Sequence, residues 1–148
     1  MTPAAQDAFR EMLLTVVGQA FSAAGYQLEN LPLKWNDGQF RFSRQLANGL
    51  TATIEFQHLT YTDTEWSSGS PSRFRVTLRR SDGLHRDLSA LVVTDFGVAI
   101  LPSAKHWWTY RDVPSLGRAL GEAGSLAVAY GMPWLSGDLS PDGDQGAE

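Results

Sequence analysis

Four arginines stand at alternate positions in segments that we expect to be β-strands, and they are the side chains best placed to do chemistry. They are Arg41, Arg73, Arg75 and Arg79. Each alternates with an apolar residue, so in a sheet the guanidinium groups share one face. Guanidinium groups hydrogen-bond carboxylates and phosphates in a fork geometry. The spacing therefore predicts a basic sheet face that could bind acidic groups, although a face that is merely solvated is the more common reason for such a pattern.

Glu55 and Gln57 have the same outward parity as these arginines. A carboxylate in the middle of a sheet can pair with an arginine across the strands. We therefore interpret Glu55 as half of a salt bridge rather than as a catalytic acid, and we include both residues in the candidate binding face.

A second candidate site lies in the segment 61–71, YTDTEWSSGSP, whose serine, glycine and proline content predicts a surface loop. Its candidate binding residues are Tyr61, Asp63, Glu65 and Trp66. Aromatic and acidic side chains on a loop can form a recognition site, because loops on a rigid scaffold often carry function. The alternative, in which Trp66 packs back onto the sheet edge, stays open.

Catalytic and metal-binding motifs are absent from the sequence. The chain has no cysteine, and its three histidines, His58, His85 and His106, are not spaced as paired metal ligands. It also lacks GxSxG, Walker-type and GxGxxG motifs. We assign no catalytic residue, no metal ligand and no cofactor, and we expect His58 and His106 to be packed structural rings. Whether the protein is an enzyme stays open, with the balance toward no.

Composition narrows the class of partner. The net charge is −4 and the pI is about 5.3, which disfavours general nucleic-acid binding. No apolar run approaches the length of about 18 residues that a membrane span needs. Residues 1–25 lack a basic leader, so we expect no signal peptide, no membrane association and a cytoplasmic location.

Periodicity predicts the secondary structure. Apolar residues recur at helical spacing over 3–25 and again over 113–131, where Gly131 is expected to end the helix. Between them, alternation predicts strands at 31–35, 39–46, 50–60 and 72–80, and a buried strand or the end of one at 96–101. The segment 84–94 could be a strand or a short helix. Gly117, Gly121 and Gly124 interrupt the last helix, and we expect close packing there to offset their cost.

These elements predict an α+β fold with an N-terminal helix, an antiparallel β-meander of about four to six strands and a C-terminal helix. Both helices should cover the same, apolar face of the sheet. We expect residues 1–136 to form a single domain and residues 137–148 to form a flexible acidic tail.

Several short segments together resemble a group of uncharacterised bacterial α+β domains of unknown function. The segments are AGY at 24–26, IEFQ at 54–57, FRVTL at 74–78, WWTYRD at 107–112 and MPWL at 132–135. Some members of that group occur near polymorphic toxins and are regarded as candidate immunity proteins. The resemblance implies a fold more than an activity, and it brings no catalytic residues.

Three hypotheses follow from the sequence. The first is a non-enzymatic protein-binding domain, immunity-like, that uses the arginine-bearing face or the segment 61–71. The second is a small-molecule binder or an unrecognised enzyme with a pocket near Trp107 and Trp108. The third is a structural protein that associates with itself. The sequence leaves the partner and the oligomeric state open.

Overall fold

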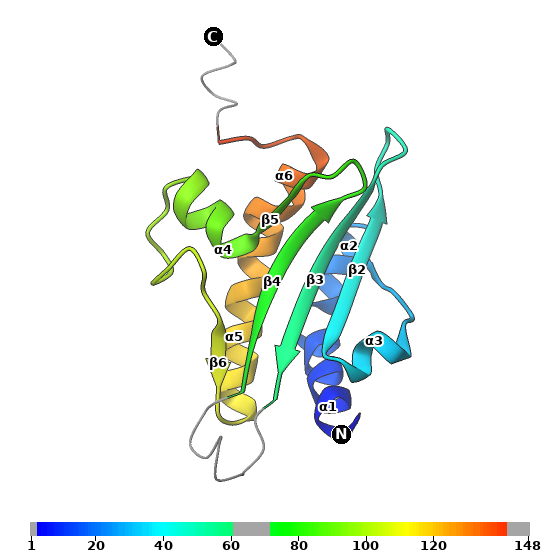
Figure 1. Cartoon of the computed structure of the whole chain (residues 1–148), viewed down its shortest axis with the longest axis vertical. Coiled ribbons are helices and arrows are strands. Elements are labelled where there is room, and N and C mark those ends of the chain that lie inside the picture. The colour runs from blue at the N-terminus through cyan, green and yellow to red at the C-terminus, as the bar shows by residue number, and fades with distance from the viewer. Residues whose placement is uncertain (1–2, 61–71, 142–148) are drawn as a thin grey trace.

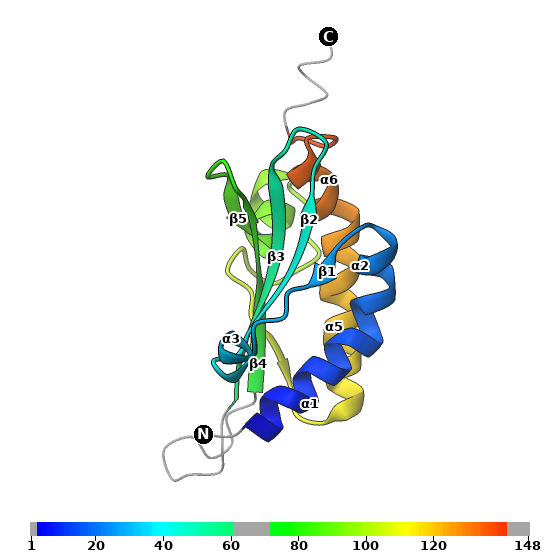
Figure 2. The same cartoon turned by 90° about the vertical axis from the view of Figure 1, so that its right-hand side faces the viewer.

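A computed structural model describes residues 3–60 and 72–141, and it shows a single antiparallel sheet with the two long helices packed on one face (Figure 1). No helix within these ranges is both long and apolar enough to cross a membrane. The α+β architecture expected from the sequence is confirmed, including the two long helices on the same side of the sheet (Figure 2).

The N-terminal helix is one continuous rod made of α1 (Pro3–Leu13), a π-helical turn η1 (Leu14–Gly18) and α2 (Gln19–Ala23). Its buried stripe consists of Phe9, Leu13, Val17 and Phe21. Gly25, with φ of +91°, ends the rod in the left-handed conformation that glycine adopts without strain. The helix predicted over 3–25 is therefore confirmed.

The sheet contains β1 (Gln27–Leu28), β2 (Gln39–Gln45), β3 (Thr51–Leu59), β4 (Ser72–Arg80) and β5 (His85–Asp87), in that order and all antiparallel. A sixth strand, β6 (Trp108–Tyr110), also pairs with β4. In the register, Ile54 lies between Phe42 and Leu78, and Phe56 lies between Phe40 and Val76. These side chains form the inner face, and all are at least 98% buried because the long helices cover them.

The edge of β4 is shared by two short strands. β5 pairs with Thr77–Arg79, whereas β6 pairs with Ser72–Phe74, so neither strand has a partner position for Arg75 or Val76. Figure 1 shows β5 and β6 lying one above the other along this edge, with α4 (Leu88–Ala90) between them in the chain. The result is a gap in the sheet edge.

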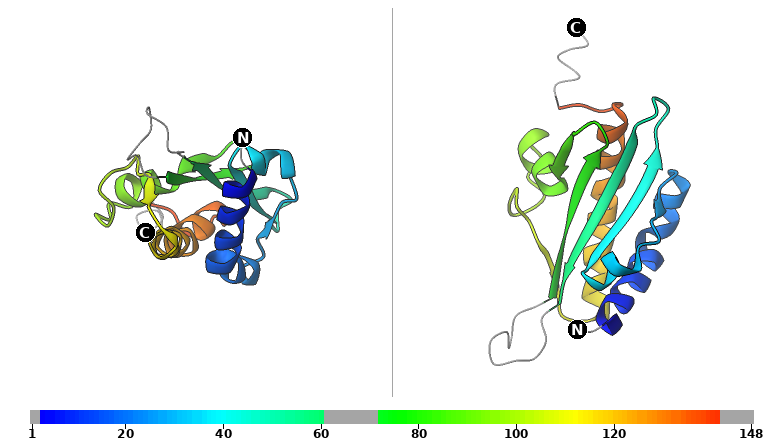
Figure 3. Two further views of the ribbon diagram at one scale, coloured as in Figure 1. Left: turned by 90° about the horizontal axis from the view of Figure 1, so that it is seen from below. Right: turned by 45° about the vertical axis from the view of Figure 1, so that its right-hand side comes forward.

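The C-terminal helix contains α5 (Val113–Leu126), a π-helical turn η3 (Ala127–Gly131) and α6 (Met132–Ser136). It begins with a capping box, in which the Asp112 carboxylate accepts a hydrogen bond from the Ser115 N–H at 2.9 Å and the Ser115 hydroxyl accepts one from the Asp112 N–H. Figure 3 shows that α5 and the N-terminal helix run side by side beneath the sheet.

Two predicted strands are wrong. The segment 31–35 belongs to the helix α3 (Pro32–Asn36), because Pro32 fits the first turn of a helix and the side chain of Leu33 is left 82% exposed. The segment 96–101 consists of turns, with Gly97 at φ of +70° and Ile100 52% exposed. A left-handed residue next to the start of this apolar run turns the chain out of an extended path.

The ambiguous segment 84–94 contains both alternatives. Its first residues form β5, and the chain then turns into α4 and a π-helical turn η2 (Leu91–Asp95). Leu88, Leu91 and Val92 are fully buried at helical spacing, which explains why this half is not a strand.

Glycines in the last helix have different roles. Gly131 does not end the helix, because it is helical and packs against Leu78; the helix ends instead before Gly137, at φ of +85°. A Cβ on Gly124 would lie 2.7 Å from Val17 Cγ1, so the two long helices touch there, as close packing requires. A Cβ on Gly121 would meet nothing within 4 Å, so close packing does not explain that glycine.

Candidate functional site

The side of β2, β3 and β4 that faces away from the long helices is the candidate binding surface, and Figure 1 looks onto it. We define this outer face by the outward-pointing residues Arg41, Glu55, Gln57, Arg73, Arg75, Thr77 and Arg79. The structure thus brings together the sheet residues singled out by their alternation. On these three strands the outward positions carry four arginines and one carboxylate, a net charge of +3 on a chain of net charge −4.

Two cross-strand contacts fix the centre of the outer face. Arg41 Nε donates to Glu55 Oε1 at 3.0 Å, which is the salt bridge expected for Glu55. Arg75 Nε donates to Gln57 Oε1, also at 3.0 Å. Glu55 is only 7% exposed, because arginine side chains can lie across the sheet with their methylene stems against it. The face is therefore less hydrated at its centre than alternation alone suggests.

Trp107 adds an aromatic ring to the outer face. The guanidinium carbons of Arg73 and Arg75 lie 4.5 and 4.9 Å from a ring centroid of Trp107, within cation–π distance. Sequence reasoning missed this placement. The signal was the alternation in WWTY, because Trp107 and Thr109 must face opposite to Trp108 if this short segment is extended.

Trp108 lies on the other side of the sheet from Trp107. It is 3% exposed, stacks on Phe74 at a centroid distance of 5.6 Å, and its Nε1–H donates to Glu122 on α5 at 2.8 Å. Within residues 3–60 and 72–141, the two tryptophans therefore face different sides of the sheet. Each tryptophan lines a separate hollow.

The hollow beside Trp107 has a volume of about 230 Å³ and occupies the gap in the edge of β4. We call it the edge pocket, and its lining residues are Arg75, Val76, Asp87, Lys105, His106 and Trp107. Asp87 is the last residue of β5, and Trp107 immediately precedes β6. The pocket thus exists because β5 and β6 pair with different parts of β4 and leave the edge between them uncovered.

Buried Ser89 holds one wall of the edge pocket in place. Its hydroxyl donates to the Ala104 carbonyl at 2.7 Å and accepts from the His106 N–H at 3.1 Å. Lys105 lies between these two anchored residues, and its own N–H donates to Ser103 Oγ at 2.8 Å. The backbone that carries Lys105 is therefore fixed on both sides.

The charges of the edge pocket are two cations and one acid. Arg75 and Lys105 are positive, Asp87 is negative, and the described part of the chain contains no ion pair that uses Lys105 or Asp87. Burial lowers the pKa of His106, and the opposing effect of nearby Glu122 is smaller, so the ring is neutral at pH 7. The pocket therefore carries a net positive charge.

The remaining predicted site residues are not gathered at the edge pocket. Arg79 is exposed on the outer face, across from Thr53 on β3 and His85 on β5. The candidates on the segment 61–71, namely Tyr61, Asp63, Glu65 and Trp66, lie outside the described residues.

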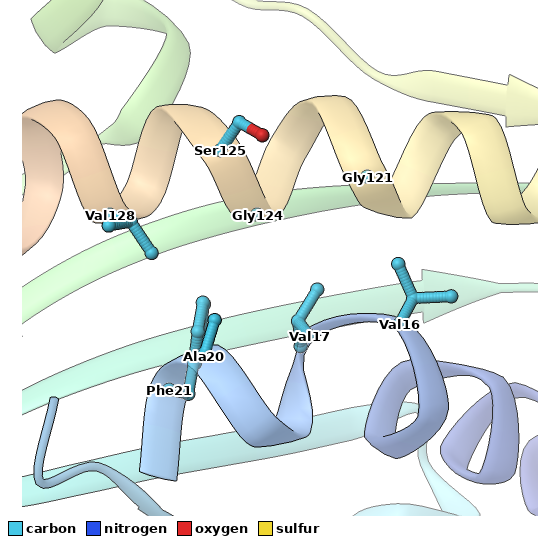
Figure 4. A pocket seen from close by; sticks show the side chains of 8 residues that line it. All are labelled: Val16, Val17, Ala20, Phe21, Gly121, Gly124, Ser125 and Val128. Atoms are coloured by element: carbon cyan, nitrogen blue, oxygen red, sulfur yellow. The ribbon is translucent and has the colours of Figure 1, made fainter. Parts of the chain in front are cut away.

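A second, apolar hollow of about 400 Å³ lies between the two long helices on the far side of the molecule (Figure 4). Its lining residues are Val16, Val17, Ala20, Phe21, Gly121, Gly124, Ser125 and Val128. None of them is titratable, so the groove offers no acid–base chemistry and no charge by which to recognise a partner.

His58 is sealed inside the protein. It is 1% exposed, stacks on Phe9 at 4.0 Å, and has Nδ1 bonded to Gln6 Oε1 at 2.8 Å and Nε2 bonded to the Tyr110 hydroxyl. Burial lowers its pKa to about 4. A neutral ring with both nitrogens bonded and no access to solvent has a structural role, as expected from its inward parity.

Residues 3–60 and 72–141 contain no group of three histidine, cysteine or acidic side chains that could hold a metal ion. In comparisons with known proteins, no family model, no curated protein and no solved structure matches the chain.

Proposed function

We propose that this protein is a non-enzymatic, immunity-like binding protein whose outer face docks onto an acidic surface of a partner protein. The observation that carries the proposal is the cluster of Arg73, Arg75 and Trp107 on the sheet face that the long helices leave uncovered. Tryptophan and arginine are the residues most enriched at the energetic centres of protein interfaces.

The cluster is ordered before any partner arrives. The Gln57 amide oxygen holds Arg75 Nε, and the Trp107 ring packs against the guanidinium groups of Arg75 and Arg73. Side chains that are already fixed lose less conformational entropy on binding. The terminal nitrogens of Arg75 can then pair with a carboxylate.

Charge complementarity supports an acidic surface on the partner. The outward positions of β2, β3 and β4 have a net charge of +3, against −4 for the whole chain, so positive charge is concentrated on this face. A local field of this kind orients an acidic partner and raises its association rate. The overall negative charge disfavours nonspecific binding to nucleic acids.

A small-molecule binder is the second candidate function, because charged groups converge in the edge pocket. Its volume of about 230 Å³ is smaller than the roughly 300–1,000 Å³ typical of pockets that enclose small ligands. A single side chain of a partner fits this space better than a whole cofactor or drug-sized substrate. We therefore place protein binding first.

Affinity capture with matched charge variants tests the proposal. The tagged wild-type chain and the variants Trp107→Ala, Arg79→Ala and Arg118→Ala are each incubated separately with a lysate of the source organism. Arg79 and Arg118 are both exposed arginines, but Arg118 is on α5, away from the outer face. We expect one protein to be retained by wild type and Arg118→Ala, retained weakly by Arg79→Ala, and lost with Trp107→Ala.

The expected loss for Trp107→Ala is at least about 30-fold in affinity, which corresponds to about 2 kcal/mol at an interface centre. Thermal unfolding of each variant checks that the fold is intact. The proposal is wrong if wild type captures nothing above background, or if Arg118→Ala weakens capture as much as Arg79→Ala. A toxin gene beside the gene for this chain would supply the first purified partner for the same comparison.

A further inference from the structure

We propose that the edge pocket receives the carboxylate of one aspartate or glutamate side chain from the partner protein, an inference that rests on the proposed function. Arg75 and Trp107 belong both to the outer face and to the lining of the edge pocket. A protein docked on the outer face therefore meets the mouth of the pocket, where one of its side chains can enter.

The charge of the pocket selects a group with a single negative charge. Arg75 and Lys105 supply two positive charges, and Asp87, the last residue of β5, supplies one negative charge. One carboxylate balances the excess positive charge. A phosphate group carries about two negative charges at pH 7, and it would lie beside the Asp87 carboxylate without full compensation. The pocket chemistry therefore favours a carboxylate over a phosphate.

The walls of the edge pocket are fixed by strand pairing and by hydrogen bonds. The gap between β5 and β6 comes from the strand register, and the Ser89 hydroxyl fixes the backbone on both sides of Lys105. The Nε atom of Arg75 is already bonded to Gln57, which aims the guanidinium without using its terminal nitrogens. A preorganised site of this kind can bind a short acidic side chain with little reordering.

Nuclear magnetic resonance titration with a small acidic probe tests this inference without a partner. The probe is N-acetyl-glutamate N-methylamide, and the signal is the Trp107 indole N–H of the ¹⁵N-labelled full chain. The isosteric glutamine compound and inorganic phosphate serve as control ligands. We expect saturable shifts at millimolar concentration with the glutamate probe, and at least about fivefold weaker binding for the glutamine compound and for phosphate.

A matched pair of variants locates the binding. Lys105→Met and Arg79→Met each remove one positive charge at an exposed residue, but only Lys105 lines the edge pocket. We expect Lys105→Met to weaken the binding of the glutamate probe at least about fivefold, and Arg79→Met to change its affinity less than twofold. Equal effects of the two variants, or equal binding of the glutamate and glutamine probes, would overturn the inference.

The source of the carboxylate is settled by two further arms. Micromolar binding of a free acid such as succinate or glutarate would mark a small-molecule site and overturn the assignment to a partner side chain. In the capture assay, full retention by Lys105→Met together with loss by Trp107→Ala would also overturn the inference while leaving the proposed function intact. Absence of capture by wild type would instead refute the proposed function, whatever the probe does.

Discussion

Buried His58 should make the protein lose stability as the pH falls from 7 to 4. Its folded-state pKa is about 4, because burial disfavours the charged ring, whereas an exposed histidine has a pKa of 6.5. At a pH between about 4 and 6.5, His58 is protonated in the unfolded chain but neutral in the folded chain. Protonation therefore pulls the equilibrium toward unfolding, and the stabilisation present above pH 6.5 is lost as the pH falls.

The size of the effect follows from the two pKa values. A difference from 6.5 to about 4 corresponds to about 3 kcal/mol when fully expressed, at roughly 1.4 kcal/mol per pH unit. Integration between pH 7 and pH 5 gives a loss of about 2 kcal/mol. Nothing in the described surroundings offsets it, because the groups bonded to the ring are Gln6, Tyr110 and, at 3.5 Å, the Thr60 hydroxyl, and none of them is a carboxylate.

Urea unfolding at half-unit steps from pH 7 to pH 4 measures this loss, with His58→Gln as the reference. Carboxylates that titrate over the same range contribute equally to both proteins and cancel in the difference. The difference in free energy of unfolding between wild type and His58→Gln should shrink by about 2 kcal/mol between pH 7 and pH 5. A difference that stays constant, or an NMR titration that places the His58 pKa near 6.5, would refute the reasoning. The NMR titration needs only wild type, so it decides the matter even if the variant does not fold.

Three further sets of substitutions test the packing of the long helices, a helix cap and a buried ion pair. Gly121→Ala should stabilise the protein by about 0.5–1 kcal/mol, because alanine favours the helix and the added Cβ meets open space. Gly124→Ala should destabilise it by about 1–3 kcal/mol, because the added Cβ clashes with Val17 on the other long helix. Equal effects of the two substitutions in urea unfolding would contradict this reasoning. Asp112→Ala should lower the melting temperature by a few degrees through loss of the helix cap, and Asp112→Asn should largely preserve it. Arg41→Met should cost about 1–3 kcal/mol because it strands the buried carboxylate of Glu55, and adding Glu55→Gln should recover part of the loss; no recovery would argue against the pair.

The architecture could be predicted from the sequence because local signals and burial agree over most of the chain. Phe40, Ile54 and Val76 alternate with polar residues, and each is buried on the inner face as period-two alternation requires. The errors occur where a single backbone preference outweighs alternation. Pro32 begins a helix inside an alternating segment, and Gly97 turns an apolar run away from an extended path.

The outer face could also be predicted, because Arg73 and Arg75 need only strand parity to share it. The edge pocket could not, since it depends on β5 and β6 using the same edge of β4 and leaving Arg75 without a partner on that side. The pairing of β6 with β4 joins residues 34 to 38 apart in sequence, from Phe74 with Trp108 to Ser72 with Tyr110, so it has no local signature. Trp107 was misplaced for a related reason, because its position follows from the register of a three-residue strand.

Site-specific photocrosslinking tests the central claim, that the outer face is the docking surface, most directly. A benzophenone side chain is placed at Thr53, on the outer face, and in a second variant at Ala20, which is exposed beside the apolar groove. Irradiation in lysate of the source organism should give one discrete crosslinked protein from Thr53 and none from Ala20. A crosslink from Ala20 alone, to a partner or to a second copy of the chain, or no crosslink from Thr53, would contradict the account.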